Sequence, residues 1–181
     1  IIVQHLGLRE TSKPVATPSI KPVNREETPL TQEEGTMYRA LVARANYLAQ
    51  DRVDIGYAVK ELCSRMSKPR KQDWDALKRL GRYLFSNPRA SIRYDWQVRQ
   101  ENIQAYTDSD FAGCRETAKS TSGGAIVIGS HLIKSYSSIQ KTVALSSAEA
   151  ELTAAVKCSC ETIGITQLAE DWGISLFGNI Y

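Results

Sequence analysis

Two clusters of carboxylates hold the residues with the most specific chemistry in this chain. Asp108 and Asp110 stand in the segment Tyr106-Thr-Asp-Ser-Asp110, and Glu149 and Glu151 follow about 40 residues later. Carboxylate oxygens are the ligands that hard divalent cations such as Mg²⁺ prefer. Each cluster alone also has an ordinary structural interpretation, because aspartates are common in turns and acids favour the first turn of a helix.

The two glutamates differ in what they can bind. Successive residues on a helix are rotated by about 100°, so Glu149 and Glu151 point about 200° apart and cannot face one metal. The order Ser146-Ser-Ala-Glu149 is a capping box, which assigns Glu149 to the start of a helix. We therefore expect Glu151 to pair with Asp108, and Asp110 to join them only if its strand continues to that residue.

Histidine and cysteine offer no alternative metal site. The chain has two histidines and four cysteines, and the cysteines show neither the paired spacing of zinc sites nor the density of a disulfide framework. With 181 residues, 42% of them hydrophobic and 24% charged, the composition is typical of one or two globular domains. No stretch approaches the roughly 20 apolar residues of a membrane-spanning helix. No secretory signal is visible either, so we expect a location inside the cell and no membrane partner.

The positive charge is concentrated in one part of the chain. Residues 60–99 contain eleven Lys or Arg and four Asp or Glu, which makes this segment +7 and leaves −4 for the rest. A solvated helix face is one interpretation of such a segment. The other is a surface that follows nucleic-acid phosphates, for which the candidate residues are Lys71, Lys78, Arg79 and Arg82.

The elements that would position these side chains follow from the sequence periodicity. After a proline-rich linker over 13–29, apolar spacing predicts one helix from a capping box at Thr31, a second from Asp54 that ends at Pro69, and a third over 72–85. Their expected buried stripes contain Met37, Tyr38, Leu41, Val42, Ala45, Leu48, Ile55, Ala58, Val59, Leu62, Met66, Trp74, Leu77, Leu80 and Leu84.

The second half of the chain has a different pattern. Strands are predicted over 92–96, 103–107, 124–128 and 131–137, then a long helix from Ser146 and the start of another strand within 174–181. We expect Gly164 to weaken or end the long helix. Its predicted buried stripe consists of Leu152, Ala155, Val156, Ser159 and Ile163.

Five motifs, in this order, resemble a known family over nearly the whole chain. They are Met37-Tyr-Arg-Ala-Leu-Val-Ala-Arg-Ala-Asn-Tyr-Leu-Ala49, Asp54-Ile-Gly-Tyr-Ala-Val59, Tyr106-Thr-Asp-Ser-Asp-Phe-Ala-Gly-Cys114, Ser120-Thr-Ser-Gly-Gly124 and Ala144-Leu-Ser-Ser-Ala-Glu-Ala-Glu-Leu152. Together they resemble the C-terminal Pol region of copia-type LTR retrotransposons. The resemblance implies an α/β fold, a ribonuclease H-like mixed sheet truncated after its first long helix and preceded by a helical tether. The implied domains are a reverse transcriptase tail and linker over 1–30, a basic helical tether over 31–90, and an incomplete ribonuclease H-like domain over 91–181.

The resemblance also implies an activity. Asp108 and Glu151 look like the first aspartate and the helix glutamate of a ribonuclease H site, with Asp110 as a further metal-binding acid and Ser122 as a nucleic-acid contact. A complete site would hold two Mg²⁺ ions and hydrolyse the RNA strand of RNA/DNA hybrids during reverse transcription. The implied partners are the hybrid and the rest of the Pol polyprotein, including the reverse transcriptase. The implied location is the cytoplasm, in the virus-like particle of the element, with the nucleus as an alternative.

The chain departs from this family pattern in ways that bear on activity. Two of the four expected acids, both aspartates, are absent from it. Phe111 stands where a tryptophan is usual, Val53 where a proline is usual, and Gly124 where relatives often have an aromatic residue. Whether this chain is an enzyme is therefore left open, and we expect the fragment to be inactive. The alternative is a non-catalytic remnant that binds nucleic acid through its basic segment.

Overall fold

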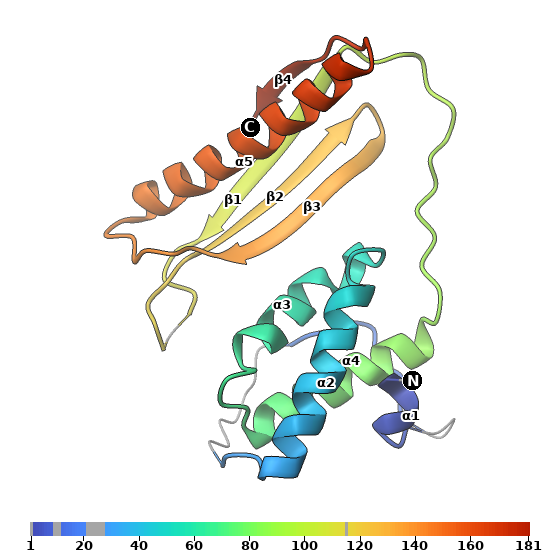
Figure 1. Cartoon of the computed structure of the whole chain (residues 1–181), viewed down its shortest axis with the longest axis vertical. Coiled ribbons are helices and arrows are strands. Elements are labelled where there is room, and N and C mark those ends of the chain that lie inside the picture. The colour runs from blue at the N-terminus through green and yellow to red at the C-terminus, as the bar shows by residue number, and fades with distance from the viewer. Residues whose placement is uncertain (1, 9–11, 21–27, 115) are drawn as a thin grey trace. The chain divides into compact units, whose positions relative to one another are not determined.

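The computed structural model describes residues 2–8, 12–20, 28–114 and 116–181. The chain forms two compact units, residues 1–92 and residues 93–181, which we call the helical unit and the sheet unit. Figure 1 shows the helices of the first unit and the sheet with one long helix of the second. Residues 13–20 of the expected linker form no helix or strand, whereas residues 21–27 lie outside the described part of the chain.

The helical unit buries the apolar stripes of its helices. It contains α1 (Ile2–His5), α2 (Gln32–Leu48), the 3₁₀ helix η1 (Val53–Ile55), α3 (Gly56–Ser64) and α4 (Lys71–Ser86). The buried core consists of Tyr38, Leu41, Val42, Ala45, Ile55, Ala58, Val59, Leu62, Leu77, Leu80 and Leu84. All of these residues belong to the stripes predicted from the sequence. Leu48, Met66 and Trp74, which were also predicted, are partly buried against this core. The prediction for Met37 is wrong, since its side chain is 40% exposed.

A local signal sets the start of α2, whereas the predicted end of the second helix is not observed. The capping box of α2 is confirmed, because Thr31 Oγ1 accepts from Glu34 N at 3.2 Å and Glu34 Oε2 accepts from Thr31 N at 3.0 Å. The prediction that the second helix reaches Pro69 is wrong, since α3 ends at Ser64. The Pro69 carbonyl instead accepts from Leu30 N at 3.1 Å, so this segment runs beside the entry to α2.

A buried arginine joins the start of η1 to the end of α4. Arg52 is 6% exposed, and its guanidinium donates to both carboxylate oxygens of Asp54, at 2.9 and 2.7 Å, and to Asn87 O at 3.1 Å. Tyr83 Oη also donates to Asp54 Oδ2 at 2.9 Å. We call these four residues the Arg52 clasp. The hydrogen bonds from Arg52 lower the pKa of Asp54, and the carboxylate raises the pKa of Tyr83.

The sheet unit is built on a four-stranded mixed sheet with the order β3-β2-β1-β4. Its strands are β1 (Asn102–Asp110), β2 (Thr121–Ile128), β3 (His131–Ile139) and β4 (Phe177–Ile180). The first three form an antiparallel meander, and β4 pairs in parallel with β1. The strands predicted over 103–107, 124–128 and 131–137 and within 174–181 are confirmed, so the fold is α/β with a mixed sheet.

The strand predicted over 92–96 does not form, because other bonds hold this segment. It has no regular structure, and its polar groups, with those of the adjacent Gln97, bind the start of β3 and the turn before it. His131 Nε2 lies 2.8 Å from Asp95 O, and Gln97 Oε1 accepts from Ser130 N at 3.0 Å. Tyr94 Oη donates to Leu132 O at 2.9 Å. These contacts replace the strand ladder that the alternating sequence pattern suggests.

The long helix α5 (Ser147–Asp171) packs on the sheet with a face different from the predicted one. Its buried residues are Ala150, Ala154, Cys158, Thr162 and Ala169. Of the predicted stripe, Leu152, Val156 and Ile163 are exposed by 65, 55 and 54%. Cys158 packs against Ile103, Ala105 and Ile126, and the small size of the buried helix residues lets the helix backbone approach the sheet closely. Neither α5 nor any other described helix is long and apolar enough to cross a membrane.

The end of α5 is set by Gly173 and not by Gly164. A Cβ added at Gly164 would meet nothing within 4 Å, and the helix continues past it to Asp171. Gly173 has a φ of 75° and its N donates to Glu170 O, while Ile174 N donates to Ala169 O. These two bonds form a Schellman motif, which favours glycine at this position.

Gly124 has a packing role in the sheet. A Cβ at this position would lie 2.4 Å from Cζ of Tyr136, which is its partner across the β2–β3 pair. The tyrosine ring therefore occupies the space above the glycine, and burial raises the pKa of the Tyr136 hydroxyl. The Tyr136 ring of the neighbouring strand thus fills the space that a side chain at position 124 would occupy.

Candidate functional site

Asp108 and Asp110 lie near the end of β1, where the sequence places them. Ile103 and Ala105 are fully buried and alternate with more exposed residues, so the period of two puts these two residues on the face that packs against the helix. Both aspartates belong to the alternate set and are exposed. The strand persists to Asp110, which pairs with Thr121 of β2. The condition under which Asp110 shares a face with Asp108 is therefore met.

The two glutamates of α5 have the separate roles that their spacing predicts. Glu149 Oε2 accepts from Leu145 N at 2.8 Å, and Glu149 N donates to Ser146 Oγ at 3.1 Å. The capping box predicts a bond from Ser146 N to this carboxylate, and the donor is instead Leu145 N, one residue earlier. In both cases the Glu149 side chain binds the start of the helix. Glu151 lies two residues after Glu149 in α5 and is exposed.

A chain of contacts brings the end of β1 and the start of α5 together. Ser109, between the two aspartates, pairs with Ser122 of β2. Ser122 Oγ accepts from Gln140 Nε2 at 3.0 Å, and the same nitrogen donates to Ala150 O at 2.8 Å. Figure 1 shows the arrowhead of β1 and the first turn of α5 at the same end of the sheet unit. The main chains that carry Asp108 and Glu151 are therefore close.

Close main chains do not fix the directions of the Asp108 and Glu151 side chains. The strand pleat directs Asp108 to the face opposite the one that α5 covers, so close main chains do not by themselves bring the two carboxylates to one ion. Within the described ranges, no three His, Cys, Asp or Glu side chains are grouped so that they could hold a metal. The donor chemistry fits Mg²⁺, since exposed carboxylates are the ligands it takes. A shared ion between Asp108 and Glu151 stays a prediction.

Asp110 is turned toward its own loop. A Cβ added at Gly113 would lie 2.0 Å from Asp110 Oδ2, so the carboxylate lies directly over this glycine. The loop after β1 holds Ala112 at a φ of 52°, and Ala112 N donates to the buried Ser120 Oγ at 3.1 Å. The position of Asp110 matches the ordinary role of an aspartate at a turn.

Ser122 lies in the interior of the sheet unit. It is 2% exposed, and its hydroxyl is occupied by the Gln140 amide. Around it, Ser120 is fully buried and Gln140 is 5% exposed. The structure therefore places Ser122 inside a buried polar cluster, away from a surface that a nucleic acid can contact.

The predicted basic residues of α4 separate into two groups. Lys71, Lys78 and Arg82 recur at intervals of seven and four residues, which places them along one side of the helix. Lys71 and Lys78 are exposed and Arg82 is partly exposed, although Asp75, 4.0 Å from Lys78, lies among them. Arg79 is different, because its Nη2 donates to Thr17 Oγ1 at 2.8 Å. We call Lys71, Lys78 and Arg82 the α4 basic row.

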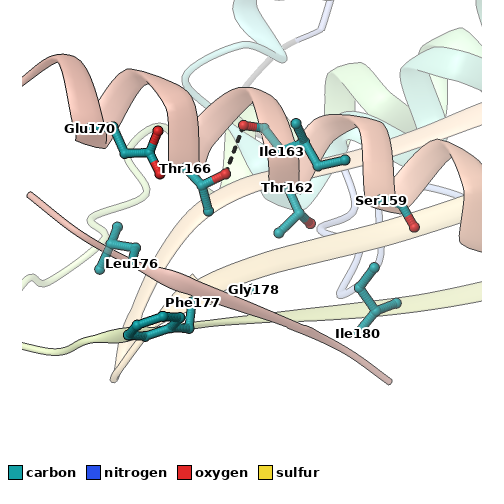
Figure 2. Close-up of a pocket in the computed structure, with 9 residues that line it drawn as sticks. All are labelled: Ser159, Thr162, Ile163, Thr166, Glu170, Leu176, Phe177, Gly178 and Ile180. Carbon is teal, nitrogen blue, oxygen red and sulfur yellow. Dashed lines mark hydrogen bonds between the residues drawn. The ribbon is translucent and has the colours of Figure 1, made fainter.

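A pocket of about 270 Å³ lies elsewhere in the sheet unit, between α5 and β4. Figure 2 shows Thr166 donating to Ile163 O above the β4 side chains. None of the residues predicted as site residues lines it. The lining consists of Ser159, Thr162, Ile163, Thr166, Glu170, Leu176, Phe177, Gly178 and Ile180.

Comparison with known proteins identifies the relatives of the chain. It is 36% identical over 167 residues to the retrovirus-related Pol polyprotein from transposon RE2 of Arabidopsis thaliana, and 38% identical over 169 residues to that from transposon RE1. Each match covers 92% of this chain. The chain belongs to the Pol polyproteins of copia-type retrotransposons. An uncharacterized mitochondrial protein of the same plant is 34% identical over 163 residues, which are 88% of this chain and 66% of that protein.

The Pol chain spans about 11% of the length of the RE1 and RE2 polyproteins. No family model matches it, and no solved structure matches it significantly. The family is thus established from sequence relatives, while the activity and partners of this segment are matters of proposal.

The buried polar cluster is the part of the site that the sequence analysis missed. Gln140 bonds to residues 10 and 18 positions away in the sequence, and such contacts produce no local periodicity. The one signal in the sequence is that a glutamine follows a strand whose residues otherwise alternate in polarity. That signal is common to many exposed glutamines, so it does not indicate burial.

Proposed function

We propose that residues 93–181 of this Pol chain are a ribonuclease H-like domain that acts on the RNA strand of RNA/DNA hybrids, and that the helical unit is its tether. The supporting observation is the arrangement of Asp108 and Glu151. One lies near the end of central strand β1, the other lies at the start of α5, and Ser122 and Gln140 connect the two elements. The Pol polyproteins to which the chain is related give the nucleic-acid context.

The roles of the residues follow from their chemistry. Asp108 and Glu151 would hold magnesium, and the bound metal would activate water and stabilise the leaving oxygen. Glu149 keeps the first turn of α5 in place through its bonds at Leu145 and Ser146. Two carboxylates hold a pair of dications weakly, so we expect little or no cleavage by the 181 residues alone.

The test is cleavage of a labelled RNA/DNA hybrid in Mg²⁺. It compares this chain with a chimera that continues after Tyr181 into the sequence that follows the matched region of the RE1 polyprotein. The chimera should cleave, and Asp108→Asn or Glu151→Gln should each lower its rate by about 100-fold or more. The matched control is Asp95→Asn, an exposed carboxylate of the same unit that pairs with Arg93. Cleavage that survives Asp108→Asn would refute the assignment.

A second candidate function is binding of nucleic acid without catalysis, which the α4 basic row favours. Three cations along one side of a helix can neutralise successive phosphates and release counterions. This function needs no metal. It predicts binding of hybrid and duplex that weakens steeply with salt.

The second candidate is tested by the salt dependence of hybrid binding in EDTA. Lys71→Ala with Lys78→Ala and Arg82→Ala should lower the slope of log K against log salt by about one per lost phosphate contact. Arg44→Ala, an exposed arginine on α2, is the matched control. An unchanged affinity and slope in the triple variant would show that the row does not bind nucleic acid.

A further inference from the structure

Gln140 occupies an unusual place for a primary amide. It directly follows β3 and is 5% exposed. Its main-chain N donates to Ser120 O at 2.8 Å, which fixes its backbone beside the residue that precedes β2. Its side-chain Nε2 donates to Ser122 Oγ and to Ala150 O, so one nitrogen bridges the sheet and the helix.

The two acceptors of this amide lie beside the two proposed metal ligands. The Ala150 carbonyl belongs to the peptide bond whose nitrogen is that of Glu151, so the amide holds the backbone at the glutamate itself. Ser122 pairs with Ser109, the residue that follows Asp108 in β1. The Gln140 side chain therefore hydrogen-bonds to both neighbourhoods.

Helix stability does not explain this arrangement. The Ala150 carbonyl is inside α5, where the amide of the residue four positions later can satisfy it. Moreover, Gln140 Oε1 and Ser109 Oγ are buried without hydrogen-bond partners among the described residues. Burial of an amide with an unpaired carbonyl costs more free energy than burial of an apolar side chain in the same space.

We propose that Gln140 is a positioning residue, which sets the distance and direction of Glu151 relative to Asp108. This inference rests on the proposed function, because it assumes that the two acids serve one metal. It concerns the chain's own geometry, so it predicts an effect on metal binding that can be measured without any cleavage.

The experiment uses Mn²⁺ as a paramagnetic probe in place of Mg²⁺ and follows the ¹⁵N-labelled 181-residue chain by NMR. In the wild type, the amide signals of Asp108 and Glu151 should broaden together over one range of Mn²⁺ concentration. Gln140→Met keeps the size of the side chain but removes both hydrogen bonds. It should weaken the common Mn²⁺ response by at least about 10-fold and separate the responses of the two amides.

Two further variants make the result specific. Thr162→Val is the matched control, because it removes a buried side-chain hydrogen bond, 2.8 Å to Cys158 O, from a later turn of the same helix. It should leave the Mn²⁺ response unchanged. Ser122→Ala removes one of the two acceptors and should weaken the response in the same direction, which keeps the test decisive if Gln140→Met does not fold.

The outcomes separate this inference from the proposed function. If the wild type shows a common response and both Gln140→Met and Ser122→Ala match it, the positioning role is wrong while the metal site stands. If the wild type shows no common response of Asp108 and Glu151, the shared metal site is wrong, and the inference is overturned with it.

Discussion

Replacement of Asp54 by asparagine should destabilise the helical unit strongly. Arg52 is 6% exposed and would keep Asn87 O as its main remaining acceptor, at 3.1 Å. Removing one partner of a buried ion pair costs about 3–5 kcal/mol. The Asp54 side chain is 27% exposed and asparagine can still accept one hydrogen bond, so we expect a smaller loss of about 2–3 kcal/mol.

The assay is urea unfolding followed by tryptophan fluorescence. Trp74 packs against the helical core, whereas Trp96 and Trp172 are 97 and 72% exposed, so the change in emission reports mainly on the helical unit. The matched control is Asp75→Asn in the same unit. Asp75 lies 4.0 Å from Lys78, and the two side chains are 69 and 47% exposed. A surface pair of this kind contributes about 0–1 kcal/mol, so the control should shift the midpoint little.

The pH dependence supplies the refutation. Because its bonds to Arg52 lower the folded-state pKa of Asp54, the clasp contributes fully above the unfolded pKa of about 4 and is lost as pH falls through the lower folded value. The stability difference between wild type and Asp54→Asn should therefore shrink on acidification below about pH 4. A difference under about 0.5 kcal/mol at pH 7, or one that does not change with acid, would show that the clasp is not a buried ion pair.

Three other predictions concern packing and capping. Gly124→Ala should destabilise the sheet unit by about 1–3 kcal/mol through collision with Tyr136, and chemical denaturation should show this loss partly reversed by adding Tyr136→Ser. Ala154→Leu should cost about 1–3 kcal/mol in the same measurement, while Val156→Ala should change stability by less than about 0.5 kcal/mol; the reverse order would restore the original prediction for the buried face of α5. Thr31→Ala should lower the stability of the helical unit by about 1 kcal/mol in urea, and no change would contradict the observed cap.

The helical unit was predictable because its helices bury their large side chains. Leu41 and Leu80 are both fully buried and both fall on stripes that the spacing of three and four residues defines. The rule fails for α5, where the close approach to a sheet selects small residues such as Ala154 and leaves Leu152 exposed. Periodicity identifies an amphipathic helix, but the shape of its partner decides which face packs.

The candidate site was predictable only where local chemistry defines it. The strand-end location of Asp108 and the helix-start role of Glu149 follow from turns and caps, which act over a few residues. Gln140 was not predictable, because its bonds depend on tertiary structure. The same holds for residues 92–96, whose alternating pattern suited a strand but whose Tyr94 and Asp95 bond to distant residues at the start of β3.

The two units have separate cores, and this affects how the chain responds when its gene accumulates substitutions. One core draws its buried residues from positions 38–84 and the other from positions 103–158, so damage to either need not melt its neighbour. A copy that collects random substitutions can then lose the fold of its helical unit and keep a folded sheet unit, or the reverse. A folded protein product is consequently weak evidence that the activity of the ancestral element is retained.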